Sequence, residues 1–381
     1  MLTRMTRLLL PALLALLLPA RTMAWGFWAH QRINRLAVFT LPPEMLVLYK
    51  AHLEYLTTHA VDPDMRRYAV DGEAERHFMD LDRYGGFPFD TLPRRWQDAV
   101  ARYTEDSLRK HGILPYHLPI EVYRLKEAFE NRDLARILKI SADMGHYVGD
   151  AHVPLHTTYN YNGQFTGQKG IHGFWESRLP ELFAEQYDFF VGRCYYVERL
   201  HDETWATVFE SHLAVDSVLE MERELSRSFP SDRKYGYESR NNVVMRVYSR
   251  EYSEAYHRMM SGMVERRMRT AIRRTGSYWY TAWQMAGAPD LTELAKQSLN
   301  EQPERYKKRL KIVDREAQEI GMALPGTPAE LCCHLPARLR AMGMLRNASL
   351  ADPAVELMLR RRADELRLRR PWWKRWWQRL F

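Results

Sequence analysis

The chain has 381 residues, of which 46% are hydrophobic and 27% charged, with 19 glycines, 19 prolines and 3 cysteines. This composition excludes a collagen-like chain, a low-complexity disordered chain and a disulfide-stapled scaffold. The formal net charge is +8, but three N-terminal arginines supply +3 and residues 360–381 supply +7. Subtracting both leaves −2 for the rest of the chain, which is not the basic surface that binds duplex nucleic acid.

Residues 1–24 have the pattern of an export signal, because two arginines precede an apolar run at 8–20 and a small-x-small cleavage site ends at Ala24. The apolar run is too short to span a bilayer comfortably. An uncleaved membrane anchor is the alternative interpretation. Cleavage predicts a periplasmic or extracellular protein whose first residue is Trp25.

Apolar residues at helical spacing dominate the rest of the chain, and no segment shows a convincing strand alternation. The sequence therefore predicts an all-α, multi-helix domain over residues 25–295 and a helical extension with a basic tail over 296–381. The clearest apolar stripe consists of Leu134, Ile137, Leu138, Met144 and Val148. Further predicted helices cover residues 30–40, 43–59, 95–111, 119–130, 173–187, 203–227, 243–274 and 303–320.

The C-terminal segment 371–381 contains two tryptophan pairs four residues apart, with cations between and after them. As a helix it would present an aromatic face and a cationic flank, which suits the headgroup layer of an anionic bilayer. We therefore expect peripheral membrane contact through this segment. A tail docked on the protein body and a mobile basic tail that binds any polyanion are the alternatives.

Ligand-type side chains concentrate between residues 146 and 176. His146 and Asp150 are four residues apart, so on one helix both emerge on the same face. A proline two residues before His156 ends or bends that helix and allows His156 to turn back toward the same cavity. His172 and Glu176 repeat the four-residue spacing. Nitrogen and oxygen donors without thiolates favour zinc over manganese or iron.

One such pair alone is more often an exposed ion pair or a satisfied core histidine. Two pairs within about thirty residues, each beside glycine and aromatic residues, favour a metal site instead. The chain resembles the superfamily of zinc-dependent phospholipases C and single-strand-specific zinc nucleases over about residues 25–290. The motifs that carry the resemblance are Trp25-Gly26-Phe27-Trp28-Ala29-His30, Asp64 and Arg67 followed by His77-Phe78-Met79-Asp80, the segment His146–His156, and His172 with Glu176.

The resemblance implies an all-helical secreted enzyme with three zinc ions. The first zinc would take Asp64, His77, His146 and Asp150. The second would take His156, His172 and Glu176. The third would take the amino group and carbonyl oxygen of Trp25, with His30 and the other oxygen of Asp150. A free α-amine titrates near neutrality and can donate a lone pair, so cleavage of the signal would complete the third site.

The resemblance also implies roles beside the metal. Arg67 would neutralise charge on phosphoryl oxygens, and Asp64 would also orient the attacking water. Asp80 would fix the tautomer of a ligand histidine. Asp62 is the alternative to Asp64, and the Pro63-Asp64-x-x-Arg67 pattern favours Asp64.

Three zinc ions, three carboxylates and a bridging hydroxide would leave a positive cleft that suits a phosphodiester anion, which a zinc-bound hydroxide would attack. We therefore expect a phospholipase C-like phosphodiester hydrolase. Glu176 and the fifteen residues between His156 and His172 resemble the phospholipase branch. The motifs around Asp64 and His77 resemble the nuclease branch, so a single-strand-specific nuclease is the alternative. A non-catalytic, zinc-stabilised scaffold at the membrane surface is a third reading, although structural zinc sites usually have four protein ligands.

Overall fold

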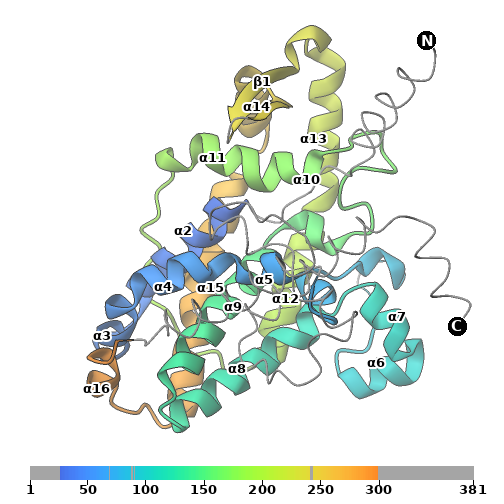
Figure 1. Cartoon of the computed structure of the whole chain (residues 1–381). Helices are drawn as coiled ribbons and strands as arrows, with labels where there is room; N and C mark the ends of the chain where they lie inside the picture. Colours follow the sequence, from blue (N-terminus) through green and yellow to red (C-terminus); the bar gives the residue numbers. More distant parts are fainter. Residues whose placement is uncertain (1–25, 68, 87–88, 90, 241–242, 299–381) are drawn as a thin grey trace, which may run out of the picture.

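The computed structural model describes residues 26–298 except 68, 87–88, 90 and 241–242, and these residues are mainly helical (Figure 1). The all-α prediction is confirmed, with one small two-stranded sheet in the described part of the chain. The predicted signal peptide, Trp25, the predicted helix at 303–320 and the tail 371–381 lie outside the described residues. Within the described ranges, no helix is long and apolar enough to cross a membrane.

Helices of different lengths and short 3-10 turns make up most of the described chain. The longer helices are α2 (Phe27–Ala37), α8 (Leu114–Glu130), α9 (Leu134–Ala151), α12 (Leu200–His212), α13 (Val215–Ser228), α14 (Arg250–Met259) and α15 (Met263–Met285). The shorter helices are α3 (Pro43–Ala51), α4 (Leu53–Thr58), α5 (Asp62–Arg66), α6 (Trp96–Tyr103), α7 (Glu105–Lys110), α10 (Ile171–Gly173), α11 (Leu179–Phe183) and α16 (Thr292–Ala295). The 3-10 turns are η1 (Val38–Thr40), η2 (His59–Val61), η3 (Ala74–His77), η4 (Leu81–Arg83), η5 (Pro154–Thr157), η7 (Ala184–Gln186) and η8 (Ser231–Arg233), and η6 (Phe174–Arg178) is a π-helix.

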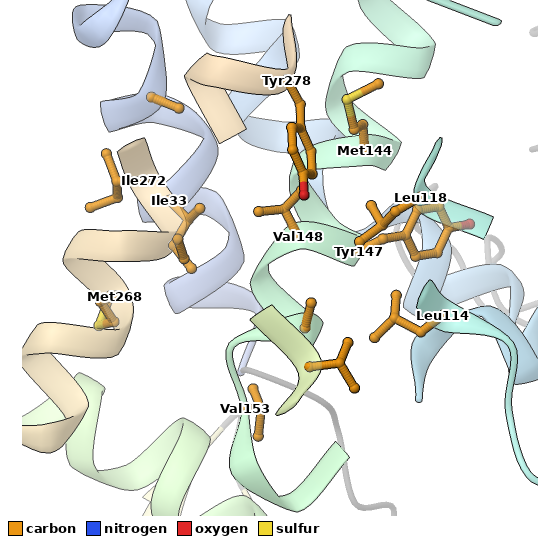
Figure 2. Packing of buried hydrophobic residues seen from close by; sticks show 14 of the residues in the cluster. Ile33, Leu114, Leu118, Met144, Tyr147, Val148, Val153, Met268, Ile272 and Tyr278 are labelled. Carbon is orange, nitrogen blue, oxygen red and sulfur yellow. The ribbon is translucent and has the colours of Figure 1, made fainter. Parts of the chain in front are cut away.

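Helix α9 is the central helix, and α2, α4, α8 and α15 pack against it. Its N-cap is Asp133, whose side chain accepts a hydrogen bond from the backbone N–H of Arg136 at 3.0 Å. The predicted stripe on α9 is buried, which confirms the spacing argument. Figure 2 shows side chains of four helices meeting there: Ile33, Leu118, Met144, Val148 and Tyr278.

Two glycines allow α2 to lie close against α9. A Cβ atom added at Gly145 would lie 1.9 Å from Asn34 Oδ1, and one added at Gly149 would lie 3.0 Å from His30 Nδ1. Asn34 Nδ2 in turn donates to the Ala142 carbonyl at 3.0 Å. The small residues of α9 therefore determine how near the histidine of α2 comes to the ligand-type residues of α9.

Several predicted helices are divided in the structure. The predicted helix 43–59 breaks at His52, and the helix 95–111 breaks at Thr104, which has a φ of 67° and caps α7 through its side chain. The predicted start at residue 119 is wrong, because α8 begins at Leu114 and carries Pro119 inside it. The proline at the second position of α8 is tolerated, because a residue in the first turn of a helix needs no N–H for an intrahelical hydrogen bond.

The predicted helix 243–274 is wrong at its beginning. Strands β1 (Tyr235–Arg240) and β2 (Val243–Tyr248) form an antiparallel hairpin, and α14 starts only after Ser249, whose side chain accepts from the Tyr252 N–H at 3.2 Å. Paired valines and a tyrosine in β2 favour a strand over a helix. Arg178 of η6 donates two hydrogen bonds to the Glu238 carboxylate, which fastens the hairpin to the segment after Glu176.

Candidate metal centre

Four predicted ligands from three elements meet inside the molecule. His77 Nδ1, at the end of η3, lies 2.9 Å from Asp150 Oδ2 and 3.1 Å from His146 Nε2, both on α9. Asp64 Oδ1, on α5, lies 3.6 Å from each of these two histidine nitrogens. The structure therefore brings together the four residues expected at the first zinc.

The three residues expected at the second zinc also meet. Glu176 Oε2 lies 3.3 Å from His156 Nε2 and 2.9 Å from His172 Nε2. His156 reaches this place because η5 starts at Pro154, directly after α9 ends. Glu176 lies in the π-helix η6, an irregularity that frequently occurs at functional sites. His156 Nδ1 is 3.7 Å from Asp150 Oδ1, so the two groups are neighbours.

His30 lies beside the first group. Its Nε2 is 3.4 Å from Asp150 Oδ1, and its ring stacks on His146 with 3.8 Å between centroids. The predicted partner Trp25 lies outside the described residues. The residue that follows it, Gly26, is so close to the helix of Glu176 that an added Cβ would lie 2.8 Å from Ser177 Oγ.

Backbone carbonyls orient two of the histidines. His146 Nδ1–H donates to the Ala60 carbonyl at 2.9 Å, and His156 Nδ1–H donates to the His77 carbonyl at 2.5 Å. Since only a protonated nitrogen can donate to a carbonyl, Nε2 of both rings is the nitrogen left for a metal. Both Nε2 atoms point toward carboxylates of the cluster.

The electrostatics of the cluster reflect a dry interior with carboxylates in it. Burial lowers the pKa of His146, but the carboxylates of Asp150 and Asp64 outweigh it and raise the pKa to about 9. Burial raises the pKa of Glu176 to about 8. Burial and then the charge of Arg67 lower the pKa of His172 to about 3. A cation among these residues would stabilise the carboxylate form of Glu176, which burial penalises.

The donor atoms fit zinc. Several buried polar atoms make no hydrogen bond within the described residues, and these include His30 Nε2, Asp64 Oδ2, Asp150 Oδ1 and Glu176 Oε1. Leaving such atoms unpaired costs free energy, and metal coordination would remove that cost. Three sets of these side chains have donor atoms within 4.8 Å of one another. Imidazole and carboxylate donors are typical of zinc sites.

Two further carboxylates that the sequence analysis considered, Asp62 and Asp80, have other partners. Asp62 pairs with His59 at 2.7 Å, whereas Asp64 Oδ1 lies 3.6 Å from His77 Nδ1 and His146 Nε2. Asp80 Oδ2 lies 3.3 Å from Nδ1 of His111, which is not one of the predicted ligand histidines. The Asp80 N–H also donates to the His111 carbonyl at 2.7 Å, which turns this stretch toward α7 and its C-terminal end.

Sequence reasoning missed Glu73. This residue is fully buried, and its Oε1 lies 3.6 Å from His77 Nε2. Glu73 and His77 are four residues apart, which is the spacing that identified the pair His146 and Asp150. The same search applied upstream of His77 could have found it.

A family model described as zinc dependent phospholipase C matches residues 29–237. The matched range is more than half of the chain and includes every described ligand-type residue from His30 to Glu176. No curated protein matches the chain at a significant level. From the family match and the site that it spans, the chain belongs to the zinc-dependent phospholipase C family.

Proposed function

We propose that the protein is a phospholipase C-type hydrolase that cleaves the phosphodiester bond of a phospholipid at a site holding three zinc ions. The position of Asp150 carries the proposal. One of its carboxylate oxygens faces His77 and His146, and the other faces His30 and His156. A carboxylate with both oxygens turned toward separate imidazole groups suits adjacent metal ions that share it.

Each ion has a set of residues that would hold it. Asp64, His77, His146 and Asp150 would hold the first, and His156, His172 and Glu176 the second. His30 and Asp150 would hold the third together with Trp25, which rests on the sequence resemblance. Zinc bound there would polarise a phosphoryl oxygen and lower the pKa of a coordinated water.

The exposure of the cluster side chains indicates where a substrate enters. His172 is 8% exposed and Asp64 7%, whereas the other cluster side chains are 0–1% exposed. Arg67 acts electrostatically on His172, so a guanidinium stands near this less buried side. There it would donate hydrogen bonds to the phosphate and offset charge that grows on its oxygens. Asp64 would accept a hydrogen bond from the attacking water.

Turnover tests the reaction. Zinc-loaded mature protein should hydrolyse bis-nitrophenyl phosphate, and His146→Ala should reduce turnover to background and lose zinc. The exposed His201→Ala serves as the matched control and should change neither. A wild-type protein that is fully loaded with zinc and hydrolyses no diester would support the scaffold interpretation instead.

The substrate needs its own comparison. Hydrolysis of phosphatidylcholine vesicles is expected, and the family match supports this choice over nucleic acid. Cleavage of single-stranded DNA without cleavage of the phospholipid would support the nuclease alternative. Inertness toward both would contradict the substrate assignment.

We also propose, from the sequence alone, that the protein is exported after cleavage at Ala24 and contacts membranes through residues 371–381. Deleting 371–381 should reduce sedimentation with anionic vesicles and retain hydrolysis of bis-nitrophenyl phosphate. Unchanged sedimentation would contradict the membrane role of this segment.

A further inference from the structure

The orientation of His77 differs from that of the other ligand histidines. Its Nδ1 atom, not Nε2, lies in the cluster, at 2.9 Å from Asp150 Oδ2 and 3.1 Å from His146 Nε2. An imidazole that binds a metal through Nδ1 carries its proton on Nε2. The Nε2 atom of His77 is buried and has no hydrogen bond within the described residues. A buried N–H group of this kind needs an acceptor.

The carboxylate of Glu73 stands beside that atom. Glu73 Oε1 is 3.6 Å from His77 Nε2, and both side chains are essentially inaccessible to solvent. A rotation of either side chain that shortens the distance by about 0.7 Å gives an ordinary N–H···O bond. His146 and His156 give their outer N–H groups to backbone carbonyls, so among these three rings the outer nitrogen of His77 is the one that faces a side chain.

Other side chains hold Glu73 in place. Its Oε2 lies 3.0 Å from Arg66 Nε and 3.0 Å from Arg76 Nη1, whereas Oε1 accepts hydrogen bonds from the Tyr147 hydroxyl and, at 3.2 Å, from Arg66 Nη2. Arg66 also donates to Asp143 Oδ1 at 2.9 Å. Two guanidinium groups and a hydroxyl therefore fix the carboxylate as an anion with one oxygen turned toward His77.

We infer that Glu73 is a positioning residue for the first metal site, where it accepts a hydrogen bond from His77 Nε2–H and so keeps Nδ1 free for the ion. A carboxylate on the outer nitrogen fixes the tautomer and raises the basicity of the ring. The inference rests on the proposed function in that the first site binds zinc. Loss of such a partner typically weakens metal binding 10–100-fold.

The structure provides a matched control for a purely structural role. Asp143 is a second buried carboxylate that pairs with Arg66, at 2.9 Å, and among the described residues it forms no hydrogen bond or ion pair with His77. Glu73→Gln and Asp143→Asn are both nearly isosteric and both remove one anion from Arg66. Urea unfolding of the two variants measures the structural contribution of each carboxylate separately from zinc binding.

Zinc affinity and the state of His77 are the readouts. Chelator competition on the full-length protein should show one zinc weakened about 10-fold in Glu73→Gln and up to 100-fold in Glu73→Ala, against less than 3-fold in Asp143→Asn. Imidazole ¹⁵N NMR of zinc-loaded wild type should show His77 protonated at Nε2, and this signal should shift or broaden in the Glu73 variants. If Glu73→Ala does not fold, Glu73→Gln carries the test.

The contrary outcomes separate two failures. Glu73 variants that bind every zinc as tightly as the wild type, or Asp143→Asn that loses zinc equally, would overturn this inference alone. A wild-type protein that binds no zinc would overturn the proposed function and this inference with it.

Discussion

Asp150 lies between His30 and the histidines of the first site, because its Oδ1 faces His30 and its Oδ2 faces His77 and His146. Glu176, by comparison, has contacts to His156 and His172 through one oxygen, Oε2. Asp150→Asn replaces a carboxylate oxygen by an amide nitrogen that is a poor zinc ligand. It should therefore lower the bound zinc by more than one ion per chain, whereas Glu176→Gln should lower it by one. Metal analysis after gel filtration measures both, and an equal loss in the two variants would contradict the shared position of Asp150.

His117 on α8 gives a prediction about pH. It is 4% exposed, and burial followed by the charge of Arg76 lowers its pKa from 6.5 to about 3. Below pH 6.5, His117 binds a proton in the unfolded chain but stays neutral in the folded protein. Its contribution to the unfolding free energy is therefore fully present above pH 6.5 and is lost as the pH decreases toward 3. Between pH 7 and 5, the wild type should lose about 2 kcal/mol more unfolding free energy than His117→Gln.

Urea unfolding at the two pH values, with equal zinc, measures this difference. The exposed His201→Gln should retain the wild-type pH dependence. An identical pH dependence in His117→Gln would show that His117 titrates normally in the folded protein.

Individual ligands were predictable from spacing, but their partners were not. The four-residue intervals from His146 to Asp150 and from His172 to Glu176 indicate a shared helix face without any structure. Which carboxylate meets a distant histidine depends on tertiary packing. Asp80 contacts His111 for this reason, whereas Glu73 precedes His77 by the same four-residue interval that links His146 to Asp150.

At the scale of elements, the contact between α2 and α9 sets the geometry of the cluster. A methyl group at Gly145 would collide with Asn34, which is held between the Leu56 and Ala142 carbonyls and cannot move freely. Gly145→Ala should destabilise the protein by about 1–3 kcal/mol, as overpacking does. Gly173→Ala is the control, because its added Cβ would meet nothing within 4 Å and alanine favours a helix.

Thermal and urea unfolding of both glycine variants measures the effect. If Gly145→Ala is as stable as the wild type, the separation of α2 and α9 is not limited by this contact.

The sequence predicts the presence of a helix better than it predicts where that helix begins and ends. The stripe on α9 is long and periodic, so its burial followed from the sequence. The hairpin at Tyr235–Tyr248 was not found, because its strands are short and are held by outside contacts such as Arg178 with Glu238. Thr104 ends a predicted helix because its φ is positive, and a threonine in the sequence does not indicate a positive φ.

At the scale of the whole molecule, the cluster joins side chains of α2, α5, η3, α9, η5, α10 and η6, which together extend from Phe27 to Arg178. Metal binding there should contribute to the global stability, because a ligand that binds only the folded state stabilises it by mass action. Removing zinc with a chelator should lower the unfolding free energy by about 4 kcal/mol for each ion bound, relative to zinc at 1,000 times its Kd. Zinc should restore it, and magnesium, which prefers oxygen ligands, should not. Equal melting curves with and without zinc would argue against metal in the core.

The proposed function depends on zinc binding by the buried imidazoles and carboxylates of the cluster. Anomalous scattering at the zinc edge from crystals of the mature, zinc-loaded protein tests it most directly. We predict peaks about 2.0–2.1 Å from His77 Nδ1 and His146 Nε2, and from His156 and His172 Nε2. Peaks confined to the surface, with none within coordination distance of these nitrogens, would show that the buried cluster does not bind zinc.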